Sequence, residues 1–240
     1  MKNLNQLYFN LMLVFLFSLL TSDILAQKSE LLKNYNWRAI GPANMGGRVT
    51  DIDGVPGDIS TFYVSGADGG IHKTIDGGVT FKPIFENQRA YSIGALTIAP
   101  SDKNILWVGT GEGDPRNSVG YGWGVYRSID GGDSWKHLGL KKTERIKRIV
   151  VDPKDPDIAC VCALGKEWGP NKERGVFKTI DGGKNWDKIL YIDEDTGCSD
   201  IAMENENPRI MYAGMWTFRR RPWRFDDGGK NTAIYKTTDG

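Results

Sequence analysis

Four aspartates of this 240-residue chain lie in nearly the same local sequence. The strings are HKTIDGGVTF, YRSIDGGDSW, FKTIDGGKNW and the shorter YKTTDG, and the aspartates are Asp76, Asp130, Asp181 and Asp239. An aspartate between a hydroxyl residue and glycine could be a catalyst, a metal ligand or part of a turn. Because an active site needs one such group and not a series of identical ones, we interpret all four as structural.

The residues around Asp130 have the chemistry of a tight turn. Its carboxylate can accept hydrogen bonds from nearby backbone N–H groups. Gly131 and Gly132 tolerate the positive φ angles that such a turn needs, and Ser128 adds a hydroxyl. Trp135 then provides an aromatic side chain that can pack between strands.

The turn recurs within a longer repeat. The aspartates follow one another at intervals of 54, 51 and 58 residues, and each interval contains short segments of alternating apolar and polar residues. Four short strands per repeat are typical of a β-propeller blade. A β-sandwich, the alternative, needs no fixed period. We therefore predict an all-β β-propeller of four-stranded blades, three complete and most of a fourth. The predicted blades comprise residues 38–90, 91–144, 145–196 and 197–240.

The N-terminal segment differs from the repeats. Residues 1–26 contain an early lysine, an apolar run over about 11–20 and a polar stretch ending in Ala26, which is typical of a secretory signal peptide. An uncleaved anchor is the alternative, although the apolar run is short for a membrane span. We expect cleavage after Ala26 and a secreted, periplasmic or cell-surface location, with no membrane association indicated after cleavage.

Charge and metal-binding residue types narrow the functional classes. The 31 Lys and Arg residues nearly balance the 30 Asp and Glu residues, so no global field favours nucleic acid. The chain has two histidines and three cysteines with no metal-ligand spacing, so we predict no metal and no cofactor. Cys160 and Cys162 share one face of a predicted strand, where core packing is favoured, and a disulfide from either to Cys198 remains open.

Long connections between the second and third strands of the later repeats are candidate binding segments. They are rich in aromatic and charged residues, and the propeller topology places them on one face. Aromatic rings suit sugars or peptide side chains, and arginines suit carboxylate or sulfate groups. The predicted ligand-binding rim consists of Glu112, Asp114, Arg116, Tyr121, Glu167, Trp168, Trp216, Arg219, Arg220, Arg221, Trp223 and Arg224.

The repeated string resembles the Asp-box, or BNR repeat, of sialidases, xyloglucan-cleaving glycoside hydrolases, sortilin-type receptors and photosystem II assembly factors. Segments such as VGTGEGDPRNSVGYGWGVYRS and MWTFRRRPWRFDDGG also resemble large exported bacterial proteins with tandem propellers. The resemblance implies the fold and says little about chemistry. Because such proteins are much longer, we expect this chain to be an N-terminal part whose propeller needs further chain to close.

Asp68 is the catalytic candidate that the resemblance implies. SGADGGIHKT is similar to the segment that carries one of two catalytic aspartates in the xyloglucan-cleaving hydrolases, which act with one carboxylate as acid and one as base. Their second aspartate lies in a second propeller, which this chain does not include, and Glu112 or Asp114 is a possible substitute. The alternative, which we favour here, is that Asp68 stabilises the GADGG turn.

Recognition is the leading functional hypothesis from the sequence. The inserts are predicted to bind a polysaccharide, protein or peptide outside the cytoplasm. The alternatives are a glycoside hydrolase using Asp68 and an assembly or scaffolding factor. The basic and aromatic segment 219–225 raises a nucleic-acid alternative, which the predicted export and balanced charge disfavour.

Overall fold

The computed structural model describes residues 48–240. The predicted signal peptide and the first part of the first predicted blade, residues 38–47, lie outside the described residues. Sixteen strands and one short 3₁₀ helix, Lys141–Thr143, follow in order. The strands are β1 (Val49–Gly54), β2 (Phe62–Gly66), β3 (Gly70–Thr74), β4 (Lys82–Pro83), β5 (Ile93–Ala99), β6 (Asp102–Thr110), β7 (Val125–Ser128), β8 (Lys136–His137), β9 (Ile146–Val151), β10 (Ala159–Ala163), β11 (Gly175–Thr179), β12 (Asp187–Leu190), β13 (Thr196–Met203), β14 (Met211–Arg221), β15 (Arg224–Asp227) and β16 (Ala233–Thr237).

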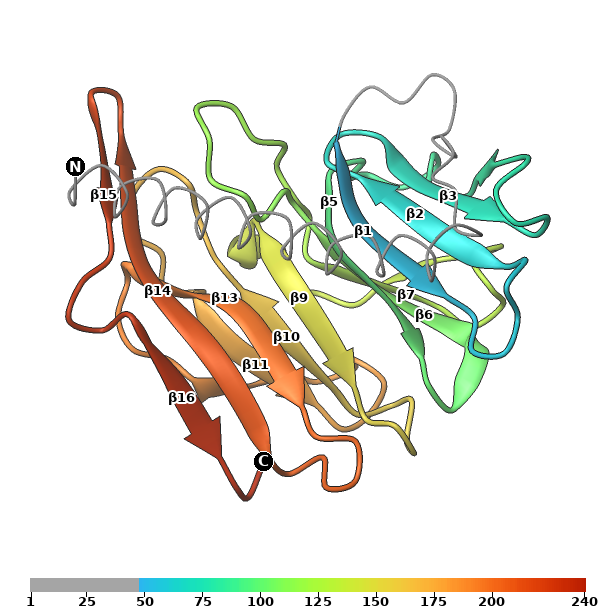
Figure 1. Ribbon diagram of the computed structural model, residues 1–240. Coiled ribbons are helices and arrows are strands. Elements are labelled where there is room, and N and C mark those ends of the chain that lie inside the picture. Colours follow the sequence, from blue (N-terminus) through green and yellow to red (C-terminus); the bar gives the residue numbers. More distant parts are fainter. Residues whose placement is uncertain (1–47) are drawn as a thin grey trace, which may run out of the picture. The chain divides into compact units, whose positions relative to one another are not determined.

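The strands form four antiparallel sheets in a propeller arrangement, which confirms the predicted fold class (Figure 1). The first three sheets each contain four strands in sequence order, β1 to β4, β5 to β8 and β9 to β12. We call them blades 1, 2 and 3. In blade 4, β14 pairs with β13 and β16, so three propeller strands are present. The first strands of successive blades, β1, β5, β9 and β13, are neighbours.

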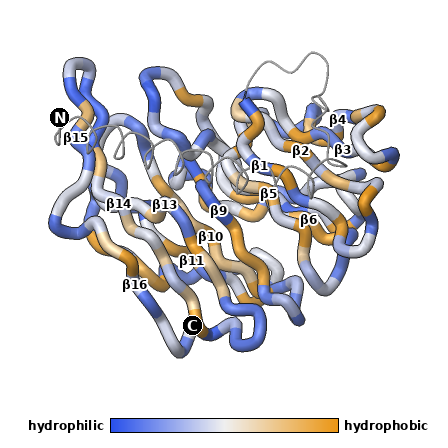
Figure 2. Tube along the Cα trace, in the orientation of Figure 1, coloured by the Kyte–Doolittle hydropathy of each residue, from blue (hydrophilic) through white to orange (hydrophobic). Residues whose placement is uncertain are grey.

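Apolar side chains fill the spaces between blades, and strands that have a blade on each side are buried on both faces: β10 is buried at every residue and β5 at all but one. Between blades 2 and 3, a cluster that includes Trp107, Ile146 and Val161 is fully buried. The indole Nε1 of Trp186 donates to the carbonyl of Leu138 in the preceding blade, so this aromatic residue packs at the blade contact. Figure 2 shows apolar residues along the strands and polar residues in the long loops.

Equivalent hydrogen bonds between neighbouring blades recur at equivalent positions of the sequence repeat. Lys73 Nζ donates to the carbonyl of Gly131 at 2.9 Å, and Lys178 Nζ donates to the carbonyl of Gly240 at 2.7 Å. In both cases a basic residue in the third strand of one blade reaches the first glycine of the next repeated turn. The repeated string therefore stabilises its own turn and also the contact between blades.

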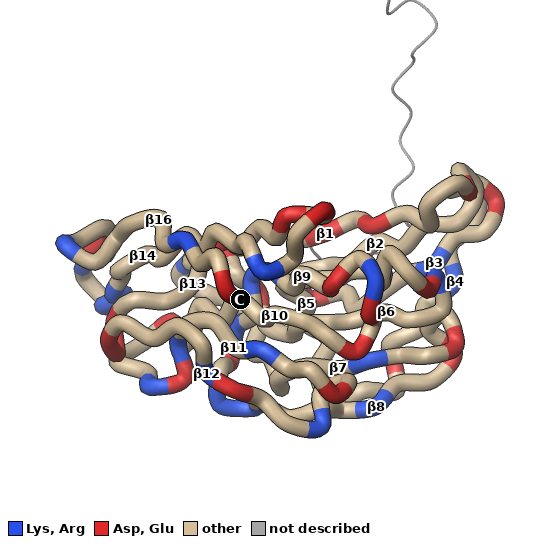
Figure 3. Tube along the Cα trace, turned by 90° about the horizontal axis from the view of Figure 1, so that it is seen from below, with Lys and Arg blue, Asp and Glu red and all other residues tan. Residues whose placement is uncertain are grey.

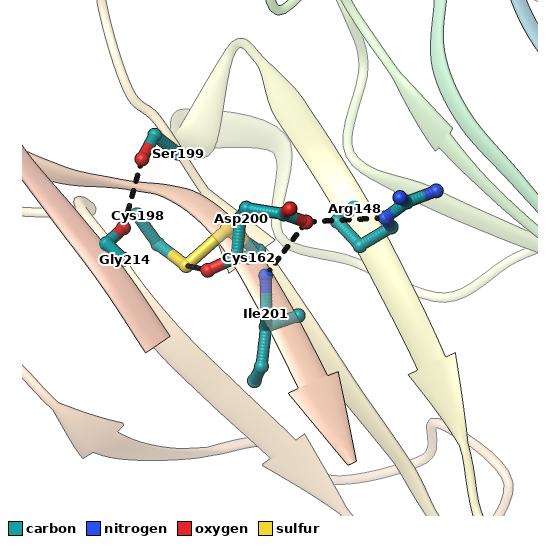
Figure 4. Close-up of a disulfide and its surroundings, with 7 residues drawn as sticks. All are labelled: Arg148, Cys162, Cys198, Ser199, Asp200, Ile201 and Gly214. Atoms are coloured by element: carbon teal, nitrogen blue, oxygen red, sulfur yellow. Dashed lines mark hydrogen bonds and ion pairs between the residues drawn. A yellow bond between two sulfur atoms is a disulfide. The ribbon is translucent and has the colours of Figure 1, made fainter. Parts of the chain in front are cut away.

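A disulfide links blades 3 and 4. Cys162 in β10 forms a disulfide with Cys198 in β13 (Figure 4). Cys160 stays a free, buried thiol. Of the alternatives left open by the sequence, one cysteine thus packs in the core and the other two cross-link blades 3 and 4. The neighbouring Asp200 carboxylate pairs with Arg148 in β9 at 3.2 Å, across the same blade contact.

Candidate functional site

Antiparallel pairing gives the propeller two distinct ends. Connections from the second to the third strand of each blade lie at one end, which we call the insert end; the repeated turns between the third and fourth strands lie at the other, the turn end. The inserts are residues 67–69, 111–124, 164–174 and 216–232 of blades 1 to 4. The sequence predicted the last of these only as a long connection; in the structure β14 continues into it and pairs with β15 as a hairpin (Figure 1).

At the turn end, the repeated aspartates are fully engaged by their own turns. Asp130 Oδ1 accepts hydrogen bonds from the Ser134 N–H at 2.8 Å and from the Ser128 hydroxyl at 2.7 Å. Gly131 and Gly132 have φ angles of 68° and 93°. Asp181 accepts equivalent bonds from Asn185 and Thr179. Such donors favour a charged acceptor and leave no free carboxylate for catalysis.

These hydrogen bonds lower the pKa values of the turn aspartates. The Ser134 hydroxyl, followed by the Ser134 N–H, lowers the pKa of Asp130 to about 2. Hydrogen bonds from the Asn185 backbone and side chain lower the pKa of Asp181 to about 2. The pKa of Asp76 is lowered as well, chiefly by the Thr80 side chain. The carboxylates are therefore ionised throughout the physiological pH range.

At the insert end, Glu112 is buried, whereas the sequence predicted it on the exposed rim. Its Oε1 accepts hydrogen bonds from Arg48 and from Arg116, the latter at 2.8 Å. The backbone N–H of Glu112 donates to the Ser92 hydroxyl at 3.0 Å. Oε2 is also buried and has no partner within the described residues. Burial raises the pKa of Glu112, an effect that Arg48 opposes.

The exposed carboxylate of Asp68 lies beside this buried glutamate. A Cβ atom at Gly120 would come within 2.2 Å of Asp68 Oδ1 and 2.4 Å of Ser92 Oγ, so the insert of blade 2 packs directly against Asp68. The negative charge of Asp68 further raises the pKa of Glu112. The structure therefore brings two carboxyl groups from neighbouring blades together, one exposed and one buried. Asp114 instead forms an exposed ion pair with Lys147 at 2.5 Å.

Glu167 was also expected on the rim, and the structure again buries it. It forms an ion pair with Arg145, and each side chain is only 1% exposed. Arg145 Nε also donates to the Gly165 carbonyl at 2.7 Å. The guanidinium of Arg174, equally buried, lies 4.4 Å from the ring centroid of Phe218 in blade 4. Sequence reasoning missed these two arginines, because an arginine beside a strand looks the same whether it is solvated or buried.

The hairpin arginines are mostly paired with carboxylates of the protein. Arg219 pairs with Asp195 in the connection before β13. Arg221 of β14 and Arg224 of β15 both pair with Asp226 of β15. Arg220 stacks on Phe225 at 5.3 Å from the ring centroid. Three of the four hairpin arginines, Arg219, Arg221 and Arg224, are thus neutralised by carboxylates of the protein.

The insert end presents exposed aromatic side chains that could contact a ligand. Tyr121, Trp168 and Trp223 are 66%, 41% and 79% exposed, and they come from the inserts of three successive blades. Trp216 is different: its ring stacks on Phe218 at 4.8 Å, and its indole Nε1 donates to Asp227 at 2.7 Å. Three of the four predicted rim aromatics are therefore available for contact, and Trp216 braces the hairpin.

The charges of the surface are mixed. Figure 3 shows acidic and basic positions interspersed along the described chain. Within residues 48–240 no group of three or more His, Cys, Asp or Glu side chains is arranged to hold a metal ion. The same residues include no helix long and apolar enough to span a membrane.

No protein-family model matches the sequence, and no curated protein matches it either. Solved structures do resemble it in fold. An ancestral GH74 enzyme aligns with a TM-score of 0.55 at 20% identity over 80% of this chain and 26% of its own. The GH74 enzyme of Niastella koreensis gives 0.56 at 19% identity over 78% and 28%. The GH74 xyloglucanase of Xanthomonas campestris gives 0.57 at 17% over 85% and 31%. The chain thus spans less than a third of the length of each, and these similarities establish the propeller fold.

Proposed function

We propose that this chain is an exported Asp-box propeller module that binds an extended polymer through its insert end. The observation that carries this proposal is the set of exposed aromatic side chains, Tyr121, Trp168 and Trp223, on inserts of neighbouring blades. Exposed rings beside polar loops on a rigid scaffold suit ligand recognition. Neutral polysaccharide fits best among the polymers, because most hairpin arginines are already paired.

Replacement of the aromatic rings tests this proposal. We expect Trp168→Ala and Trp223→Ala, singly and together, to weaken retention of the protein on immobilised polysaccharides such as xyloglucan and β-glucan. Tyr212→Ala is the matched control, since Tyr212 is 43% exposed but lies at the start of β14, away from the inserts. Equal loss in the control, or undiminished retention in the double variant, would refute the assignment.

Export is part of the same proposal. The predicted signal peptide implies that the mature protein begins near Gln27 outside the cytoplasm. N-terminal sequencing of the protein recovered from the producing cells measures this directly. A mature protein that still begins at Met1, recovered from the cytoplasm, would contradict export.

A glycoside hydrolase is the second candidate, and the proximity of Asp68 to Glu112 favours it. An exposed carboxylate beside a buried carboxyl whose pKa is raised by burial is an arrangement suited to acid–base hydrolysis. If this is the activity, Asp68→Asn should abolish sugar release from a β-glucan panel. Asp114→Asn, a nearby exposed carboxylate, should leave sugar release unchanged. Full activity of Asp68→Asn would remove Asp68 from the mechanism.

A further inference from the structure

Two equivalent grooves lie at the turn end, at the contacts between blades 1 and 2 and between blades 2 and 3. We call them groove 1, of about 280 Å³, and groove 2, of about 310 Å³. Each is lined by an exposed isoleucine of the repeated turn, the aromatic residue that follows the turn, and a lysine of the fourth strand. These residues are Ile75, Phe81 and Lys82 in groove 1 and Ile129, Trp135 and Lys136 in groove 2.

The isoleucines are not required by the turn. Ile75 and Ile129 are each 69% exposed, although burial of such side chains is favourable. Their position precedes the aspartate and contributes only backbone to the turn. In the fourth repeat the same position is Thr238, and Thr237 and Asp239 still form their hydrogen bond at 2.7 Å. An exposed apolar side chain at this position is therefore available for contact with another molecule.

The lysines of the grooves have no ion-pair partner within residues 48–240. Lys136 and Lys184, the latter contributed to groove 2 by the next turn, are both exposed. Of the two acidic residues that line groove 2, Asp157 pairs with Arg127, and Asp181 accepts the bonds of its own turn while keeping its negative charge. Figure 3 shows basic positions at β8. Groove 2 thus combines apolar surface with two exposed lysines that form no ion pair with any described residue, and its lining carries three basic side chains, of Arg127, Lys136 and Lys184, against two acidic ones, of Asp157 and Asp181.

Groove 1 and blade 3 provide natural contrasts. In groove 1 the residue that corresponds to Lys184 is Asp133, which opposes the charge of Lys82, and the second lysine of the lining, Lys73, is engaged by the Gly131 carbonyl. In blade 3 the position that corresponds to Lys82 and Lys136 is Asp187. If positive charge attracts the ligand, these differences predict that groove 2 binds it most tightly, that groove 1 binds it more weakly, and that blade 3 binds it hardly at all.

We propose that groove 2, and groove 1 more weakly, binds an extended acidic peptide. Its apolar side chains would contact the exposed isoleucine, and its carboxylates would pair with Lys136 and Lys184. A peptide suits groove 2 better than a sugar polymer because Trp135, the aromatic residue of its lining, is already engaged within the protein. Trp135 is partly buried, its ring packs edge-on against Phe85 at 5.0 Å, and its Nε1 donates to the Ile84 carbonyl. This site is independent of the aromatic residues of the insert end.

Fluorescence anisotropy with a labelled peptide of alternating leucine and aspartate, about ten residues long, tests the site. We expect saturable binding that weakens with added salt, since exposed charges are screened. Reversal of both lysines in Lys136→Glu/Lys184→Glu should weaken binding at least about tenfold, and Ile129→Ser should weaken it as well. In groove 1, Asp133→Lys should strengthen binding.

The matched control is Lys230→Glu, the same charge reversal on an exposed residue of the insert end. It should leave peptide affinity unchanged, and thermal unfolding should verify that every variant is folded. Equal loss in Lys230→Glu, or unchanged affinity in the double variant, overturns the proposal. So does equal affinity for a peptide with asparagine in place of aspartate, or binding of an acidic oligogalacturonate in the absence of peptide binding. Retention on polysaccharide by Trp168 and Trp223 is measured separately, so the two proposals can fail independently.

Discussion

At the scale of single residues, the repeated aspartate converts a glycine-rich segment into a defined turn. Its two carboxylate oxygens collect donors from the residue two positions before and from the residue four positions after, as for Asp130 with Ser128 and Ser134. Hydrogen bonds to a charged acceptor are stronger than neutral ones. One aspartate per blade thus fixes the connection into the fourth strand.

Replacement of this acceptor should cost stability and nothing else. We expect Asp130→Ala to lower the free energy of unfolding by about 1 kcal/mol, a modest value because the turn is exposed to solvent. Chemical denaturation measures the change. Retention on polysaccharide should be unaffected, because the turn lies at the end opposite the inserts; weaker retention at unchanged stability would contradict the structural role.

The lowered pKa values predict acid sensitivity. A carboxylate whose pKa is lower in the folded protein than in the unfolded chain stabilises the fold above the unfolded value and loses that contribution as pH falls through the folded value. Asp130 and Asp181 have folded pKa values of about 2. The melting temperature should therefore fall between about pH 4 and pH 2, and the fall should be smaller in an Asp130→Asn/Asp181→Asn variant than in the wild type.

At the scale of elements, the disulfide fastens β13 to β10 across a blade contact. Cys162 and Cys198 are separated by 36 residues, so the bond restricts a sizeable loop of the unfolded chain. The bond therefore holds the first strand of blade 4 against blade 3.

Removal of this cross-link should loosen blade 4. We expect Cys162→Ala/Cys198→Ala to lower the free energy of unfolding by about 2–4 kcal/mol. Treatment of the wild type with a strong reductant in denaturant should reproduce the loss after refolding, and the double variant should not respond to reductant. Identical stability of wild type and variant would mean that the bond contributes nothing.

At the scale of the whole molecule, a buried electrostatic cluster joins blades 3 and 4. Arg145 and Arg174 lie 5.4 Å and 4.4 Å from the ring centroid of Phe218, and Arg145 pairs with Glu167 beneath the inserts. Buried charges must be paired, because desolvation penalises each one alone. The cluster therefore fixes how the hairpin of blade 4 sits on the insert of blade 3.

Breaking one side of this pair should be costly. Arg145→Met or Glu167→Leu alone leaves a buried charge without a partner and should destabilise the protein by about 3–5 kcal/mol. The double variant should recover a large part of that loss, since neither charge remains. A double-mutant cycle by chemical denaturation gives the coupling energy; simple additivity of the two single losses would show that the residues do not act as a pair.

The sequence by itself determined the propeller and its turns. Strand alternation and the Asp-Gly-Gly chemistry act over a few neighbouring residues, so a single sequence displays them directly. It also located the inserts, because antiparallel strand order alone assigns connections to one end or the other.

Only the tertiary structure decided which insert residues are exposed and which are buried. Glu112 and Glu167 read as rim residues in the sequence, yet their burial depends on Arg48, 64 residues away, and on Arg145, 22 residues away. The pairing of Cys162 with Cys198 and the approach of Gly120 to Asp68 likewise join separate segments. Such contacts depend on how the blades pack against one another, and no local pattern of residues specifies which segments of neighbouring blades meet.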